Sequence, residues 1–185
     1  MSEKLEHRIQ RAGAQLREDT AKALLLAIRN KLIRAWKDDL MSGGAEAIQK
    51  YVQIAGTAPK YSIFGGELRQ DGEGRATPFD RDPQSARLFR NDGAWFHFTL
   101  TVGESTELEL LAYSFELVFP KDHVPPFIRF DLNEATHENA AREIRSHFHP
   151  GNDDLLCPAP MMRPDEIIDL FFWKLGPRDP ENPRR

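Results

Sequence analysis

The chain has 185 residues, of which 40% are hydrophobic and 29% charged, and its formal net charge is −4. This composition is typical of a soluble globular protein, and no run approaches the roughly 20 apolar residues of a membrane span, so no membrane association is expected. The single cysteine, Cys157, excludes an internal disulfide, and the charged N-terminus without a signal-peptide pattern predicts a cytoplasmic location. The acidic balance argues against a general nucleic-acid binder.

The first forty residues have helical periodicity, with apolar residues mostly three or four positions apart. A single helix over 3–40 would be about 57 Å long, more than the width of the remaining domain. We therefore expect either a break, near Gly13 or residues 17–20, or a long helix that packs on a partner. A glycine-containing stop at 42–44 precedes a short amphipathic helix over 45–54.

From residue 60 onward apolar and polar residues tend to alternate, with a period close to two, and this pattern predicts strands. They are expected at 61–64, 94–102, 108–119, 127–132 and 143–149. Short turns join the last four, which favours an antiparallel meander. The segment 68–90 is rich in Gly, Pro, Asp and Arg and is expected to be a long irregular loop.

A final helix is expected over 164–175, beginning at Pro164 and apolar most of the way round, so it should pack on the sheet or on another chain. The expected fold is α+β: an antiparallel β-meander sheet of four to five strands packed by this C-terminal helix, with N-terminal helices. The expected division is a helical segment over 1–56, a sheet domain over 60–176 and a disordered tail over 177–185.

The candidate site is a polar row in the last expected strand. Arg145, His147 and His149 point to one face of that strand, and Ser146 and Phe148 to the other, because side chains alternate. Ile144, Ser146 and Phe148 together resemble a core-facing set, so the polar row should face away from the core.

The preceding strand carries Arg129 and Asp131 on the corresponding face, and His137 lies in the connection between the two strands. If the strands pair, these residues form one patch. The candidate catalytic residues are then His147, His149, Arg145 and His137, and the candidate substrate-binding residues are Arg129 and Asp131.

Three interpretations fit this patch. In the first, RNA is cleaved without a metal or other cofactor, with His147 and His149 as acid and base and Arg145 binding phosphate. In the second, the two imidazoles bind a metal ion, with Asp131, His137 or Asp153 completing the ligand set. In the third, the patch is an ordinary solvated sheet face with cross-strand ion pairs.

Two further residues receive structural interpretations. His97, within an aromatic strand, is expected to be a sheet residue whose ring has a partner. Cys157 is expected to be a buried, unreactive thiol, because no base partner is implied.

The order of motifs over 129–173 is an Arg-x-Asp pair, a lone His, Arg-x-His-x-His, a proline-flanked turn and a helix beginning with Pro. It resembles the TumE-like toxin family and related uncharacterised bacterial families from toxin–antitoxin and defence neighbourhoods. The resemblance implies a small α+β bacterial protein. It also implies that five polar positions match the family pattern: Arg129, Asp131, His137, His147 and His149.

The sequence therefore supports three functional hypotheses: a toxin–antitoxin or defence component acting on RNA, a non-enzymatic interaction subunit, or a metal-dependent enzyme. The expected partners are RNA, or a protein partner or second copy bound through the N-terminal or C-terminal helix.

Overall fold

The computed structural model describes residues 15–66, 81–138 and 144–175. The helices are α2 (Ala21–Lys37), α3 (Gly44–Tyr51) and α5 (Pro164–Asp169), with a π-helical turn (Leu170–Lys174) after α5 and a 3₁₀ turn at Pro83–Ser85. The strands are β1 (Val52–Thr57), β2 (Lys60–Gly65), β3 (Leu88–Phe89), β4 (Trp95–Glu104), β5 (Leu108–Val118), β6 (Phe127–Leu132), β7 (Ser146–His149) and β8 (Cys157–Pro158).

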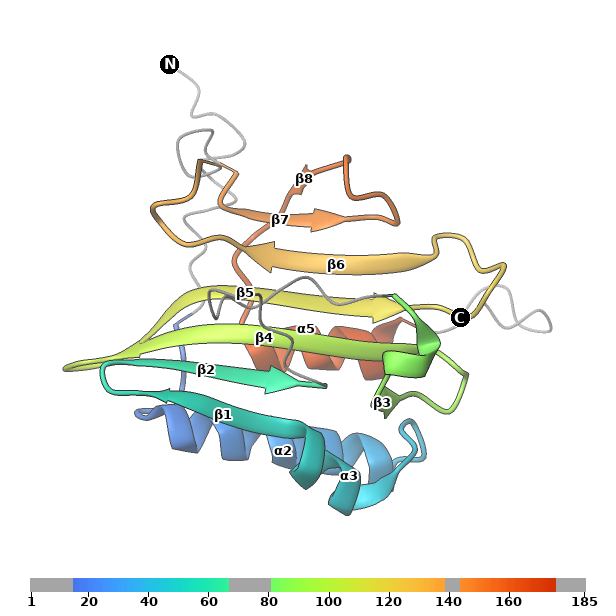
Figure 1. Ribbon diagram of the computed structural model, residues 1–185, viewed down its shortest axis with the longest axis horizontal. Helices are drawn as coiled ribbons and strands as arrows, with labels where there is room; N and C mark the ends of the chain where they lie inside the picture. The colour runs from blue at the N-terminus through green and yellow to red at the C-terminus, as the bar shows by residue number, and fades with distance from the viewer. Residues whose placement is uncertain (1–14, 67–80, 139–143, 176–185) are drawn as a thin grey trace.

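The described strands form one antiparallel sheet in the order β1-β2-β4-β5-β6-β7-β8, with β3 paired beside β4 (Figure 1). The predicted α+β class with an antiparallel sheet is confirmed. The described sheet has eight strands rather than four to five. The additional strands include β1, β3 and β8, two of which are only two residues long and carry little sequence signal.

The two faces of the sheet differ in what they bury. Along β4, Phe96, Phe98 and Leu100 belong to the main core, whereas the alternate residues His97 and Thr99 point to the opposite face. Helices α2 and α5 pack in that same core, and Figure 1 shows both along one side of the sheet. We call the opposite face the open face because helices α2 and α5 do not pack on it, and it carries polar residues of β4, β5, β6 and β7.

Helix α2 begins after a break. Residues 15–20 are not helical, in agreement with the weak point expected at 17–20, and the Thr20 hydroxyl accepts a hydrogen bond from the backbone N–H of Ala23. The buried side of α2 includes Leu24, Ile28 and Leu32. The expected break at Gly13 lies outside the described residues.

The segment after α3 differs from its prediction. A helix over 45–54 was expected, but it ends at Tyr51 and the chain continues as β1. The expected gap between the helical segment (1–56) and the sheet domain (60–176) thus falls at the β1–β2 turn. Residues on both sides of this turn share the main core. The helical spacing of apolar residues over 45–51 continues through Val52 and Ile54, and β1 has few other apolar residues. The sequence pattern therefore did not distinguish the strand from a longer helix.

The C-terminal helix packs as expected. Ile167, Ile168, Phe171 and Phe172 are buried in the core shared with α2 and the sheet. The Arg90 guanidinium donates to the backbone carbonyl of Phe171 and so satisfies an acceptor near the helix end. Packing within the chain therefore accounts for the apolar character of this helix.

Two other predictions change in extent. The fourth strand of the expected meander begins at Ser146 rather than residue 143, and residues 139–143 lie outside the described residues. Of the loop expected at 68–90, residues 68–80 also lie outside them, whereas 81–90 contains the 3₁₀ turn and β3. The tail at 177–185 is not described. Among the described helices, none is both long and apolar enough to cross a membrane.

Candidate metal centre on the open face of the sheet

Strands β6 and β7 are neighbours, and their polar faces coincide. Asp131 lies opposite His147, and Arg129 lies opposite His149, in the antiparallel register. Both imidazoles are 3% exposed, so they do not form part of a solvated surface. The register therefore produces a buried cluster of two histidines and one aspartate.

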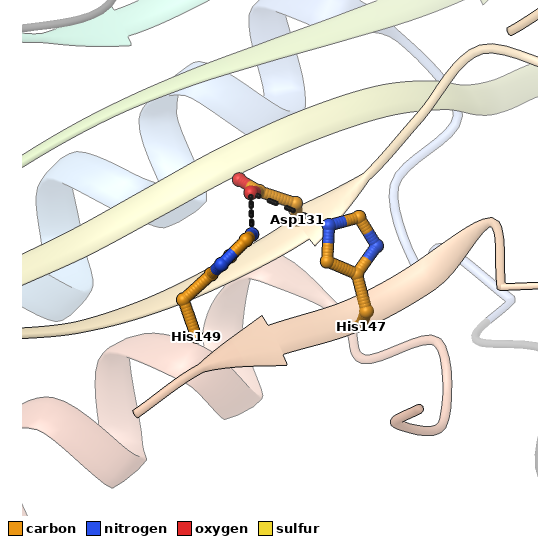
Figure 2. A group of neighbouring side chains, drawn as sticks. All are labelled: Asp131, His147 and His149. Atoms are coloured by element: carbon orange, nitrogen blue, oxygen red, sulfur yellow. Dashed lines mark ion pairs between the residues drawn. The ribbon is translucent and has the colours of Figure 1, made fainter. Parts of the chain in front are cut away.

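The two rings converge on one carboxylate oxygen, as Figure 2 shows. The distance from Nε2 to Asp131 Oδ2 is 3.2 Å for His149 and 3.7 Å for His147. Ligand atoms bound at about 2.1 Å to a tetrahedral ion lie about 3.4 Å apart, which is close to both distances. One potential ligand atom from each of the three residues lies within 4.8 Å of the other two.

The other ring nitrogens identify the tautomers. His147 Nδ1 lies 3.0 Å from the backbone oxygen of Ile144, and His149 Nδ1 lies 3.3 Å from that of Asn152. A carbonyl oxygen can only accept, so each Nδ1 carries a hydrogen. In a neutral ring the Nε2 lone pair then faces the carboxylate, an arrangement that requires a second proton or a cation. Histidine ligands of metals use this same Nδ1–H bond to set their orientation.

The protonation states of His147 and Asp131 favour a cation over a second proton on His147. Burial, partly opposed by the charge of Asp131, lowers the pKa of His147 and favours its neutral form. Burial alone would raise the pKa of Asp131, but its polar contacts with His149 and Ser114 and the charge of Arg129 lower it. The cluster thus presents a carboxylate and a neutral imidazole to the space between them.

A charge network extends from this cluster across β6 and β5. Arg129 donates from Nε to Asp131 at 2.8 Å and from Nη1 to Asp153 at 2.6 Å. Arg81 makes two hydrogen bonds to Glu116, at 2.9 and 2.7 Å, and two to Asp153, at 2.7 and 2.8 Å. The network therefore joins the cluster on β6 and β7 to β5 and to the turn that contains Asp153.

A pocket of about 1230 Å³ lies over β4, β5 and β6. The charged residues on its wall are Arg81, Glu116, Arg129, Asp131, Glu134 and Asp153. Residues that carry a hydroxyl group, among them Thr99, Thr101 and Ser114, also line the pocket. Because Asp131 lines this pocket, a small molecule in it would lie next to the histidine–aspartate cluster.

Two candidate residues have different surroundings from those expected. The Arg145 guanidinium donates hydrogen bonds to the backbone oxygens of Asn133, at 2.7 Å, and Leu111, at 2.8 Å. It therefore binds main-chain carbonyl groups and does not point into the histidine cluster. His137 lines the pocket from the β6–β7 connection but is not one of the three clustered residues. Asp153, considered above as a ligand, is instead bound by two arginines.

Sequence reasoning did not identify Arg81 and Glu116 as site residues. Glu116 carried a usable signal, because it is a charged residue in the apolar strand β5. Arg81 carried none, because its region was expected to be irregular. His97 does have the ring partner expected: its Nε2 lies 3.2 Å from Glu116 Oε1. Cys157 is partly exposed in β8 and not buried as expected.

No protein-family model, curated protein or solved structure matches this chain.

Proposed function

We propose that the protein is a metal-dependent enzyme that binds a divalent transition metal such as zinc through Asp131, His147 and His149. The observation that carries this proposal is the paired orientation of the two imidazoles. Each gives its Nδ1 hydrogen to a backbone carbonyl and turns Nε2 toward the same carboxylate oxygen. Two histidines and one carboxylate leave coordination positions open for water or substrate.

The pocket supports a catalytic rather than a purely structural metal. Structural zinc sites have four protein ligands, whereas catalytic sites have three. The described cluster has three residues, and one of them, Asp131, lines the pocket. A bound metal would supply an activated water or a Lewis acid for hydrolysis. Arg129, which holds Asp131 through Nε, would orient the reacting group from β6.

The geometry gives less support to metal-free RNA cleavage by the two histidines. Both Nδ1 atoms are bound to backbone carbonyls, and Arg145 is bound to two others. A place in a toxin–antitoxin or defence system, with RNA as substrate, stays a prediction from the sequence resemblance. Binding of a protein partner or a second copy through either terminal helix also stays a prediction.

Metal analysis of purified protein tests the proposal. After incubation with Zn²⁺ or Mn²⁺ and gel filtration, elemental analysis should find about one metal ion per chain. Loss of an outer-shell hydrogen-bond partner typically weakens metal binding by about 10–100-fold. Metal affinity should fall by more than this in each of the three ligand variants, His147→Ala, His149→Ala and Asp131→Ala.

His97→Ala is the matched control, because His97 is also a buried histidine on the open face of the sheet. It should retain the metal, and circular dichroism should show that all four variants are folded. A wild-type protein that holds no metal would refute the proposal, and so would a His97→Ala variant that loses as much affinity as the other three.

A further inference from the structure

Two arginines in the pocket converge on one exposed carboxylate. Arg81 and Arg129 together donate three hydrogen bonds to Asp153, each between 2.6 and 2.8 Å. Asp153 lies in the connection between β7 and β8, and its side chain is 52% exposed. This is unlike Glu116, the other carboxylate that Arg81 binds, whose side chain is 4% exposed within β5.

Both guanidinium groups are held in place by contacts that do not involve Asp153. Arg81 binds Glu116 through two nitrogens, and its guanidinium carbon lies 3.4 Å from the centroid of the Phe127 ring. Arg129 binds Asp131 through Nε. The arginine pair should therefore keep its position when the Asp153 carboxylate moves away.

Arginine recognises carboxylate and phosphate groups through such paired N–H donors. A guanidinium that is already oriented loses less conformational entropy on binding an anion than one on a free side chain. The site also lies in the pocket beside Asp131. An anion bound there would be next to the proposed metal centre.

We propose that Arg81 and Arg129 form a binding site for the phosphate or carboxylate group of a pocket ligand, and that the Asp153 carboxylate occupies this site in the ligand-free chain. The site requires only the two arginines, so it goes beyond the metal proposal and does not depend on it. Asp153 acts as a tethered competitor that a ligand oxyanion displaces.

Titration with inorganic phosphate and, separately, with acetate tests this site. Calorimetry is done with a chelator present, so that the result does not depend on the metal centre. Asp153→Ala and Asp153→Asn should bind one of the two anions at least tenfold more tightly than the wild type. The anion with the larger gain identifies the group that the site prefers. Adding Arg81→Gln to Asp153→Ala should abolish the gain.

Glu134→Ala is the matched control for charge, because Glu134 is also an acidic residue on the pocket wall. It pairs with Lys60 at 2.8 Å and touches neither arginine in the described contacts. Phosphate and acetate affinity should stay at the wild-type level in this variant. Equal affinity of the wild type and both Asp153 variants for each anion would overturn the proposal, as would an equal gain in Glu134→Ala.

Discussion

At the scale of single residues, His97 illustrates how the surroundings of a side chain set its charge. It lies on β4 beside Glu116, near the two arginines of the pocket. Burial, together with the positive charges of Arg81 and Arg129, lowers the pKa of His97 to about 3. The ring is therefore neutral at physiological pH despite its contact with a carboxylate.

This pKa predicts a specific pH dependence of stability. The folded pKa lies below the ordinary value of 6.5, so as the pH falls from 6.5 toward 3 the unfolded chain takes up a proton that the folded chain excludes. His97 should then reduce the free energy of unfolding by up to about 1.4 kcal/mol per pH unit.

Urea denaturation at pH 7 and pH 5 measures this effect. His97→Gln lacks the titrating ring, so the wild type should lose about 2 kcal/mol more stability than the variant over this interval. NMR should show that the His97 ring does not titrate between pH 8 and pH 5. A ring that titrates near pH 6.5 would contradict the prediction.

At the scale of elements, the close pairing of β2 with β4 depends on a glycine. Gly65 lies opposite Phe98 in the register, and a Cβ at Gly65 would be 2.1 Å from Phe98 Cε1. The Phe98 ring is fully buried and stacks on Phe115 at a centroid distance of 4.8 Å. A Cβ at Gly65 would therefore require the Phe98 ring to shift within the packed core.

Gly65→Ala should accordingly destabilise the protein by about 1–3 kcal/mol through overpacking. Gly103→Ala is a matched control on the paired strand, because its Cβ would make only ordinary contact, 3.5 Å from Leu111 Cδ1. The control should stay within about 1 kcal/mol of the wild type. Thermal or chemical denaturation measures both, and equal losses would show that the Phe98 contact is not the cause.

At the scale of the whole molecule, helices and sheet share one core. Residues of α2, of α5 and of β1 to β6 belong to the same buried cluster. The N-terminal helical segment is therefore joined to the sheet by packing as well as by the pairing of β1 with β2. Loss of contacts in α2 should weaken the sheet as well.

Leu32→Ala tests this coupling, because Leu32 is fully buried on α2. The substitution should cost about 2–5 kcal/mol and leave a single transition in which helix and sheet signals coincide. Leu26→Ala, on the exposed side of the same helix at 58% exposure, should change stability by no more than about 0.5 kcal/mol. Far- and near-ultraviolet circular dichroism in urea provide the two signals, and separate transitions would contradict a shared core.

The sequence by itself determined the fold class and which side chains share a face within each strand. The period of two places Asp131 on one face of 127–132, and His147 and His149 on one face of 146–149. The pairing of the two strands, which makes these faces coincide, was a condition of the prediction and is supplied by the structure. The shared faces depend on alternation along each strand. The pattern that they follow is local, so it is visible in the sequence.

Only the tertiary structure decided which partner each polar group has. Arg81 meets Glu116 and Asp153 across 35 and 72 residues of the chain, and Arg145 binds the carbonyl of Leu111 across 34. Hydrogen bonds of this kind follow from the packing of distant segments, which no local period encodes. The same packing turns both imidazoles toward Asp131, and so converts a polar row on a strand into a candidate metal centre beside a pocket.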